Sequence, residues 1–337
     1  MTETSVVVSR VGHLGRLHLN RPNALNSLTL EMVRLLQAGL SEFEDDGDIA
    51  SVLISGEGAR ALCAGGDIIA LFNAADGNEA EAITFWTEEY DLNARIASYP
   101  KPYIAFMDGI TMGGGVGVSV HGSHRVVTER TKFAMPEAGI GLFPDVGGTW
   151  VLGRQSPGEM GTYIGLTGDV LEAGDAISAG LADSYMSSES LPKLVSALAA
   201  SADRAAVTRS IYAFSEVSPP SVIDQNRAEI DATFAQDTVE EIIAALTSLN
   251  TDFAKATLTT LAQKSPTSLK MTLALLRAGR GSCNLRQCLD RELGAVIQMF
   301  RQPDFREGIR AAVIDKDRNP QWAPKELAEV SAPEFES

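Results

Sequence analysis

Short apolar runs alternate with amphipathic stretches through the first half of the chain. Strand-like apolar runs lie at residues 6–8, 14–19, 51–54, 103–107 and 125–128. Helical spacing of apolar positions lies between them, at residues 28–43, 72–99 and 113–121. Thr29 stands where it can cap the first of these helices. Because strands and helices keep alternating, the pattern predicts an α/β fold with parallel or mixed strands.

The second half of the chain loses the strand pattern. From about residue 191 onward the apolar spacing is helical, at residues 197–206, 219–234, 239–249, 252–261 and 285–300. We therefore predict an α/β core over residues 1–190 and a mostly helical C-terminal region over residues 191–337.

Composition and charge narrow the classes of function. The chain has 337 residues, which is enough for a sizeable core. Its formal net charge of −16 argues against a nucleic-acid binder and against a protein that binds anionic membranes. Its three cysteines are too scattered for a disulfide framework. The N-terminal residues resemble neither a signal nor a transit peptide, so we expect a cytoplasmic protein with reduced thiols.

Two glycine-dense segments are the first candidates for chemistry, ALCAGGD at 61–67 and GITMGGGVG at 109–117. Glycine this dense between a strand and a helix is typical of close packing. It also leaves backbone N–H groups unshielded, and one from each turn would form an oxyanion hole for a carbonyl. The sequence contains no P-loop, no nucleophile elbow and no zinc-protease motif, and its four histidines suggest no metal cluster.

Two acids form the second candidate. Glu137 and Asp145 lie eight residues apart in the apolar, Gly/Pro-rich stretch AMPEAGIGLFPDVGG. A carboxyl group among apolar neighbours is costly unless it is paired or its raised pKa serves acid–base chemistry. Spacing alone slightly favours an ordinary helix cap or a surface acid for these residues.

With these residues, the sequence resembles the enoyl-CoA hydratase/isomerase (crotonase) superfamily. The resemblance rests on LNRPNALNSLTLEM, ALCAGGDI, KPYIAFMDGITMGGGVGVSVH, FAMPEAGIGLFPDVGGTWVL and LTGDVLEAGDAISAGLAD. It implies a ClpP-like spiral of ββα units with a helical C-terminal region. It further implies an acyl-CoA thioester as substrate, no metal or redox cofactor, and a homo-oligomer that is a trimer or a hexamer.

Two segments resemble the 3-hydroxyisobutyryl-CoA hydrolase branch of this superfamily. They are HGSHRVVTERTKFAMPEAGIGLFPDVGG and a C-terminal extension with SPTSLKMTLALLRAG and DFREGIRAAVIDKDRNPQW. By motif, the resemblance places the oxyanion-hole N–H groups on Gly66 and Gly114. It makes Glu137 the catalytic glutamate, Asp145 a second catalytic acid and Glu89 a substrate-pocket residue. All five residues would contact the bound substrate.

One departure from the hydratases of this superfamily bears on the reaction. Those enzymes hold a water between two glutamates, and Gly117 stands where the first of the two would be. This departure disfavours hydration, and the resemblance to the hydrolase branch implies thioester hydrolysis of a short 3-hydroxyacyl-CoA, namely 3-hydroxyisobutyryl-CoA in valine catabolism. Glu137 would act as nucleophile or as general base. An enoyl-CoA or dienoyl-CoA isomerase or hydratase, and a catalytically idle CoA-binding member, are the alternatives.

Overall fold

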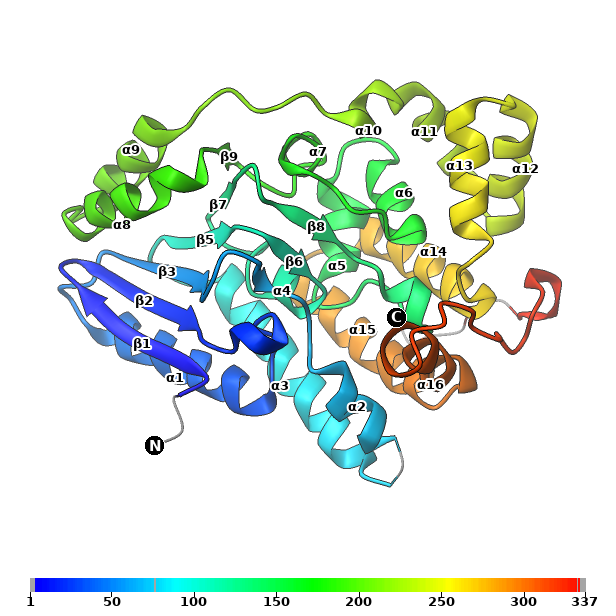
Figure 1. Cartoon of the computed structure of the whole chain (residues 1–337), viewed down its shortest axis with the longest axis horizontal. Coiled ribbons are helices and arrows are strands. Elements are labelled where there is room, and N and C mark those ends of the chain that lie inside the picture. The colour runs from blue at the N-terminus through cyan, green and yellow to red at the C-terminus, as the bar shows by residue number, and fades with distance from the viewer. Residues whose placement is uncertain (1–3, 76, 332, 334–337) are drawn as a thin grey trace. The chain divides into compact units, whose positions relative to one another are not determined.

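The computed structural model describes residues 4–75, 77–331 and 333 (Figure 1). Its contacts divide the chain into two compact units. The first unit contains Met1–Asp67, Thr87–Phe133 and Val170–Ser221, and the second contains Ile68–Trp86, Ala134–Asp169 and Val222–Ser337. Each of these units combines segments that are distant in the chain. They therefore do not test the predicted division near residue 190, which stays a prediction.

The first unit begins with a hairpin and a long helix. Strand β1 (Val6–Val11) pairs antiparallel with β2 (Leu14–Leu19). Helix α1 (Leu30–Asp45) follows, and the hydroxyl of Thr29 accepts a hydrogen bond from the Met32 N–H at 3.3 Å. The predicted cap of this helix is therefore confirmed.

From β3 onward, successive strands alternate between two sheets. The larger sheet has the order β1-β2-β3-β5-β7-β9 and the smaller sheet has the order β4-β6-β8. The strands after the hairpin are β3 (Ser51–Gly56), β4 (Ala61–Cys63), β5 (Tyr103–Met107), β6 (Ile110–Met112), β7 (His124–Val127), β8 (Lys132–Ala134) and β9 (Ser184–Tyr185). The pairs β2–β3, β3–β5 and β5–β7 are parallel. Each ββ step therefore moves the chain from one sheet to the other, as a spiral of ββα units requires.

Helices cover both faces of the larger sheet within the first unit. On one face Gly15 lies against the Phe43 ring of α1, where a side chain at position 15 would collide with the ring. On the other face Leu53 and Phe106 belong to a buried cluster with the apolar side chains of α8 and α9. The further helices of this unit are α4 (Gly114–Gly117), α7 (Ala173–Ser178), α8 (Leu191–Ala199), α9 (Arg204–Phe214) and the C-terminal part of α3 (Glu79–Ala97).

The second unit is largely helical (Figure 1). Its α-helices include α2 (Ile68–Ala74), α5 (Gly148–Trp150), α6 (Met160–Thr167), α10 (Val222–Gln225), α11 (Arg227–Phe234), α12 (Val239–Leu249), α13 (Asp252–Leu261), α14 (Pro266–Gly281), α15 (Leu285–Phe300) and α16 (Pro303–Ile309). A π-helical turn, Val151–Gln155, continues α5, and another, Arg310–Ile314, continues α16.

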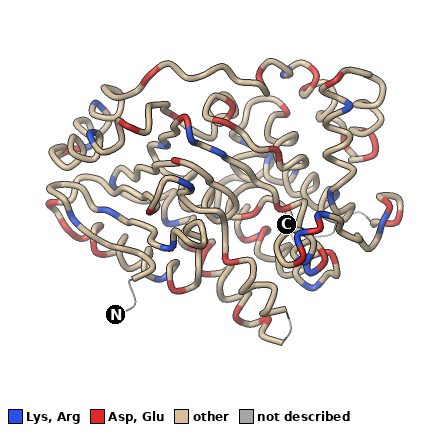
Figure 2. Tube along the Cα trace, in the orientation of Figure 1, with Lys and Arg blue, Asp and Glu red and all other residues tan. Residues whose placement is uncertain are grey.

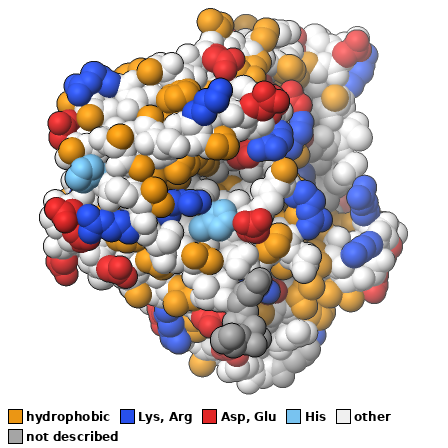
Figure 3. All heavy atoms as spheres, turned by 60° about the vertical axis from the view of Figure 1, so that its left-hand side comes forward, with side chains coloured by type: hydrophobic (Ala, Val, Ile, Leu, Met, Phe, Trp, Pro, Cys, Tyr) orange, Lys and Arg blue, Asp and Glu red, His pale blue; other side chains and the backbone are white. Residues whose placement is uncertain are grey.

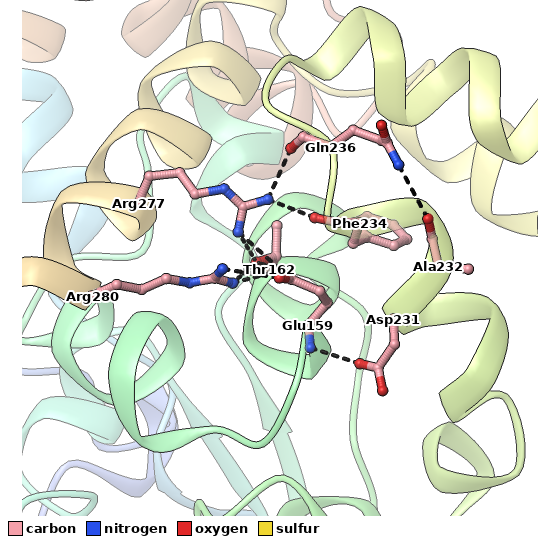
Figure 4. A network of polar contacts seen from close by, with 8 residues as sticks. All are labelled: Glu159, Thr162, Asp231, Ala232, Phe234, Gln236, Arg277 and Arg280. Atoms are coloured by element: carbon pink, nitrogen blue, oxygen red, sulfur yellow. Dashed lines mark hydrogen bonds and ion pairs between the residues drawn. The ribbon is translucent and has the colours of Figure 1, made fainter.

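A charged cluster ties three segments of the second unit together (Figure 4). Arg277 and Arg280 of α14 each place a guanidinium nitrogen 2.9 Å from a carboxylate oxygen of Glu159. Arg277 also donates to the backbone carbonyls of Phe234 and Gln236, at 2.6 and 2.9 Å. These contacts join the start of α6, helix α14 and the end of α11.

Several predicted helices have other bounds in the structure. The helix expected over 72–99 is divided between α2 and α3, and Gly77 between them takes a φ of +134° that helices do not adopt. The helix expected over 113–121 is only one turn, Gly114–Gly117, because its glycines disfavour helix. The helix expected over 197–206 is wrong, since α8 ends at Ala199 and Asp203 caps a new helix.

Acidic and basic positions are interspersed along the chain trace (Figure 2). Many of them are paired, as in the bonds of Arg125 to Asp183 and of Arg95 to Glu44. Among the described residues, no helix combines the length and the apolar character needed to cross a membrane.

Candidate functional site

The two glycine turns lie against each other in the first unit. A methyl group at Gly114 would come within 3.3 Å of the Gly66 nitrogen, and one at Gly65 within 3.9 Å of the Gly114 nitrogen. Gly65 and Gly113 take φ values of +111° and +48°, which side chains disfavour. Glycine therefore permits both the turns and their close approach.

The backbone N–H groups of Gly66 and Gly114 donate no hydrogen bond within the part of the chain that the structure describes. The bridge at Gly66 is made by its neighbours, with Leu28 N–H donating to Gly65 and Asp67 N–H donating to Leu28, both at 2.8 Å. Gly114 opens α4, so its N–H has no acceptor within the helix. Two adjacent donors of this kind can bind an oxygen on which negative charge develops.

Glu89 of α3 lies beside the same turns. Its side chain is buried, and its Oε1 occupies the position where a side chain at Gly114 would begin. Burial raises the pKa of the neighbouring Cys63 to about 12, and the charge of Glu89 adds to this effect. The thiol of Cys63 therefore stays protonated at neutral pH and is no candidate nucleophile.

Glu137 lies in the second unit, at the start of the 3-10 turn Glu137–Ile140, and is only 6% exposed. The ammonium group of Lys264 lies over the same turn, 3.7 Å from where a methyl group at Gly139 would be. Burial lowers the pKa of Lys264, although the charges of Asp169 and Glu137 act in the opposite direction. Nothing in the sequence marked Lys264, because only the fold brings it to Glu137.

Asp145 lies in a tight turn of the second unit and is 7% exposed. Its backbone carbonyl accepts from the Gly148 N–H at 2.6 Å. Val146 takes a φ of +52°, which is unfavourable for a β-branched residue, and Gly147 takes +80°. The N-cap position of α5 is Gly147 and not Asp145. Burial and position thus disfavour both the surface acid and the helix cap as explanations of Asp145.

A carboxyl group from α15 holds this turn. Glu292 accepts from the N–H of Gly147 at 2.7 Å, from the N–H of Thr149 at 3.0 Å and from the Thr149 hydroxyl at 2.5 Å. The pKa of Glu292 is raised to about 8, mainly by burial and also by the charge of Asp145, against the opposing effect of these hydrogen bonds. The fold therefore supports the strained turn through a residue far away in sequence.

Glu292 is not among the residues predicted from the sequence, although the sequence carries a signal for it. Its position lies on the buried face of α15 with Leu289 and Val296, at helical spacing. An acid on the apolar face of an amphipathic helix needs a specific partner. The pattern could therefore have marked Glu292, but it could not have identified the turn that it holds.

The predicted site residues fall into two groups. Gly66, Gly114 and Glu89 come together in the first unit, while Glu137 and Asp145 belong to the second. In the described residues, no three His, Cys, Asp or Glu side chains are grouped so that they could hold a metal ion.

Known proteins resemble this chain along nearly its whole length. A family model described as enoyl-CoA hydratase/isomerase matches residues 14–337. The mitochondrial 3-hydroxyisobutyryl-CoA hydrolase of Xenopus tropicalis is 42% identical, and the match covers 96% of this chain and 86% of the relative. The human enzyme of the same name is 40% identical, with 97% and 86% covered.

Solved structures extend the resemblance to the fold. A carnitinyl-CoA dehydratase from Mycobacterium thermoresistibile superposes with a TM-score of 0.93, 42% identity, and 98% and 94% of the two chains covered. An enoyl-CoA hydratase from Rhodobacter sphaeroides 2.4.1 gives a TM-score of 0.90 and 40% identity, with 97% and 95% covered. The predicted crotonase-type α/β fold is confirmed.

The expectation of a cytoplasmic location is contradicted by these relatives, whose names place them in mitochondria. That expectation rested on the first residues and on the scattered cysteines.

Proposed function

Because the chain belongs to the enoyl-CoA hydratase/isomerase family, we propose that it hydrolyses 3-hydroxyisobutyryl-CoA to 3-hydroxyisobutyrate and CoA, a step of valine catabolism. The observation that carries this proposal is an identity of 40–42% to 3-hydroxyisobutyryl-CoA hydrolases over at least 96% of the chain. The proposed substrate is one short 3-hydroxyacyl thioester among the many CoA thioesters that the family's fold can serve.

In this proposal the N–H groups of Gly66 and Gly114 bind the thioester carbonyl oxygen. Their closeness and their lack of other acceptors among the described residues support this role. Charge grows on that oxygen when a nucleophile adds to the carbonyl carbon. Removing one such donor typically costs about 3–4 kcal/mol of transition-state stabilisation.

Glu137 would supply the catalytic carboxylate. As a nucleophile, it would add to the carbonyl carbon and expel the CoA thiolate, leaving an anhydride that water then cleaves. As a general base, it would instead take a proton from the attacking water. Asp145 would orient the substrate hydroxyl or the water, and Glu89 would hold the 3-hydroxyl end. A thiolate is a good leaving group, so this route needs no metal or redox cofactor.

Hydration of an enoyl-CoA is the second candidate function, because the similar solved structures are named as a dehydratase and a hydratase. Gly117 argues against it for this chain. It is the last residue of α4, and it offers no carboxyl group where hydratases of the family have their first glutamate. Efficient addition of water to a double bond would need another acid at that place.

A thiol-release assay tests the proposal. Purified protein is mixed with 3-hydroxyisobutyryl-CoA, isobutyryl-CoA or crotonyl-CoA, and free CoA is measured with a chromogenic thiol reagent. Cys283 is exposed and would itself react, so a protein-only blank or a Cys283→Ser variant is the reference. We expect thiol release to be fastest from 3-hydroxyisobutyryl-CoA. Loss of the conjugated absorbance of crotonyl-CoA without thiol release would favour a hydratase, and no reaction with any thioester would favour an idle member.

A further inference from the structure

A cavity of about 390 Å³ lies in the first unit, between the larger sheet and α8. Arg16 pairs with Leu53 and His18 with Ser55 in the β2–β3 register, so these side chains point to the same face. The residues that matter here are Arg16, His18, Leu53, Phe106, Leu191 and Val195. None of them belongs to the glycine turns or has a part in the proposed reaction.

The Arg16 side chain has no partner within the described residues. No hydrogen bond or ion pair between them involves its guanidinium, and its Nε is shielded from solvent without an acceptor. By contrast, Arg10 and Arg125 in the same unit pair with Asp46 and Asp183. A buried donor without an acceptor is unfavourable, so the arrangement is suited to a ligand that supplies the acceptor.

The other polar groups of the cavity already have partners. His18 Nε2 lies 2.9 Å from a carboxylate oxygen of Glu57, and since a carboxylate only accepts, Nε2 carries the proton. The Ser55 hydroxyl lies 2.9 Å from Nδ1 of the same ring. Asp108 accepts from Arg130 Nε at 2.9 Å, so its charge is compensated. Arg16 therefore contributes the uncompensated charge of this cavity.

We propose that the cavity binds a short aliphatic monocarboxylate. Its carboxylate would accept from the guanidinium of Arg16, whose planar fork matches two oxygens. Its hydrocarbon tail would lie against apolar walls that include Leu53, Phe106, Leu191 and Val195. The volume lies within the range of about 300–1,000 Å³ that is usual for small-molecule sites.

The chemistry of the walls favours this ligand over inorganic phosphate. One guanidinium among apolar side chains suits a single negative charge with an apolar tail, whereas a phosphate needs several donors. On the side that comes forward in Figure 3, hydrophobic side chains gather near basic and histidine side chains. The inference does not depend on the proposed hydrolysis.

Titration of 2-methylpropanoate, followed by ligand-observed NMR on the full chain, tests the proposal. We expect saturable binding to the wild type and a Kd at least about tenfold higher for Arg16→Gln, because a hydrogen-bonded charge is lost. Arg209→Gln is the matched control, since Arg209 is exposed on α9. It should bind as the wild type does. The neutral isostere 2-methylpropanamide should not bind detectably.

A second variant keeps the test independent of the charge change. Val195→Phe fills the cavity and leaves Arg16 in place, so it should also weaken binding at least about tenfold. The proposal is overturned if the wild type does not bind 2-methylpropanoate, or if binding survives both Arg16→Gln and Val195→Phe. Tighter binding of inorganic phosphate than of 2-methylpropanoate would overturn the proposal that the ligand is an aliphatic carboxylate.

Discussion

At the scale of single residues, the proposed reaction depends on carboxyl groups that the fold withdraws from water. Glu89, Glu137 and Asp145 are all less than 10% exposed, although acids usually lie at the surface. Burial of this kind is typical of the acids and bases of active sites. Substitutions that keep shape and remove charge are therefore the informative ones.

Glu137→Gln should abolish turnover and leave the Kd for a CoA thioester nearly unchanged. The amide keeps the size of the side chain but can act neither as nucleophile nor as base. Single-turnover kinetics and a binding titration measure the two effects, with Glu172→Gln at an exposed site as control. If the variant keeps more than about a tenth of wild-type kcat, an effect below about 1.4 kcal/mol, Glu137 is not the catalytic carboxylate.

Asp145→Asn should lower kcat/KM on 3-hydroxyisobutyryl-CoA about a hundredfold, equal to about 2.7 kcal/mol, and should leave CoA binding intact. The tight turn holds this side chain in place, which suits it to orienting a hydroxyl or a water. Melting temperature and kcat/KM are measured on the same preparation. A lower melting temperature with unchanged kcat/KM would make Asp145 a structural residue only.

At the scale of elements, the helices of the second unit are joined by charge as well as by apolar packing. Burial alone would raise the pKa of Glu159, but the hydrogen bonds from Arg280 and Arg277 lower it overall. The glutamate is therefore ionised within the cluster of Figure 4. Removing its charge leaves two partly buried guanidinium groups without their common partner.

Glu159→Gln should destabilise the chain by about 2 kcal/mol, below the range for a fully buried pair because both arginines are partly exposed. Chemical denaturation measures the free energy of unfolding. The matched control is Asp290→Asn, which breaks the exposed pair with Arg286 and should cost less than about 0.5 kcal/mol. Equal losses of unfolding free energy in the two variants would show that the Glu159 cluster stabilises the chain no more than an exposed ion pair does.

At the scale of the whole molecule, Glu292 links stability to pH. In the unfolded chain a glutamate has a pKa of about 4.3, whereas burial raises the pKa of Glu292 to about 8 in the folded chain. Between these values the folded state holds a proton that the unfolded state has released. The contribution of Glu292 to the free energy of unfolding is therefore complete below its unfolded-state pKa. That contribution is lost as the pH rises through its folded-state pKa.

Glu292→Gln should remove this pH dependence. Relative to the variant, the wild type should lose about 1 kcal/mol of unfolding free energy per pH unit between pH 5 and 8. The amide nitrogen of Gln cannot accept from Gly147 N–H, so the variant also carries a constant loss of about 1 kcal/mol. Denaturation curves at several pH values measure both effects. A difference between the two proteins that does not change with pH would contradict the assignment.

The local pattern of apolar and polar residues determined much of the secondary structure of this protein. Apolar runs predicted the strands Leu14–Leu19 and Tyr103–Met107 at their observed bounds, and helical spacing did the same for α12, α13 and α15. The glycine turns were also visible, because close packing needs glycine. Spacing alone instead favoured a helix cap or a surface acid for Glu137 and Asp145, which the structure buries. Each of these properties depends on neighbours within a few residues.

Only the tertiary structure decided which groups meet. Gly66 and Gly114 are far apart in the sequence, and their adjacency follows from the ββ steps that move the chain between two sheets. The same holds for Glu292 with the turn at Asp145, for Lys264 with Glu137, and for Arg16 within its cavity. Pairing and burial of such groups depend on contacts between distant segments, which a local pattern of apolar and polar residues does not contain.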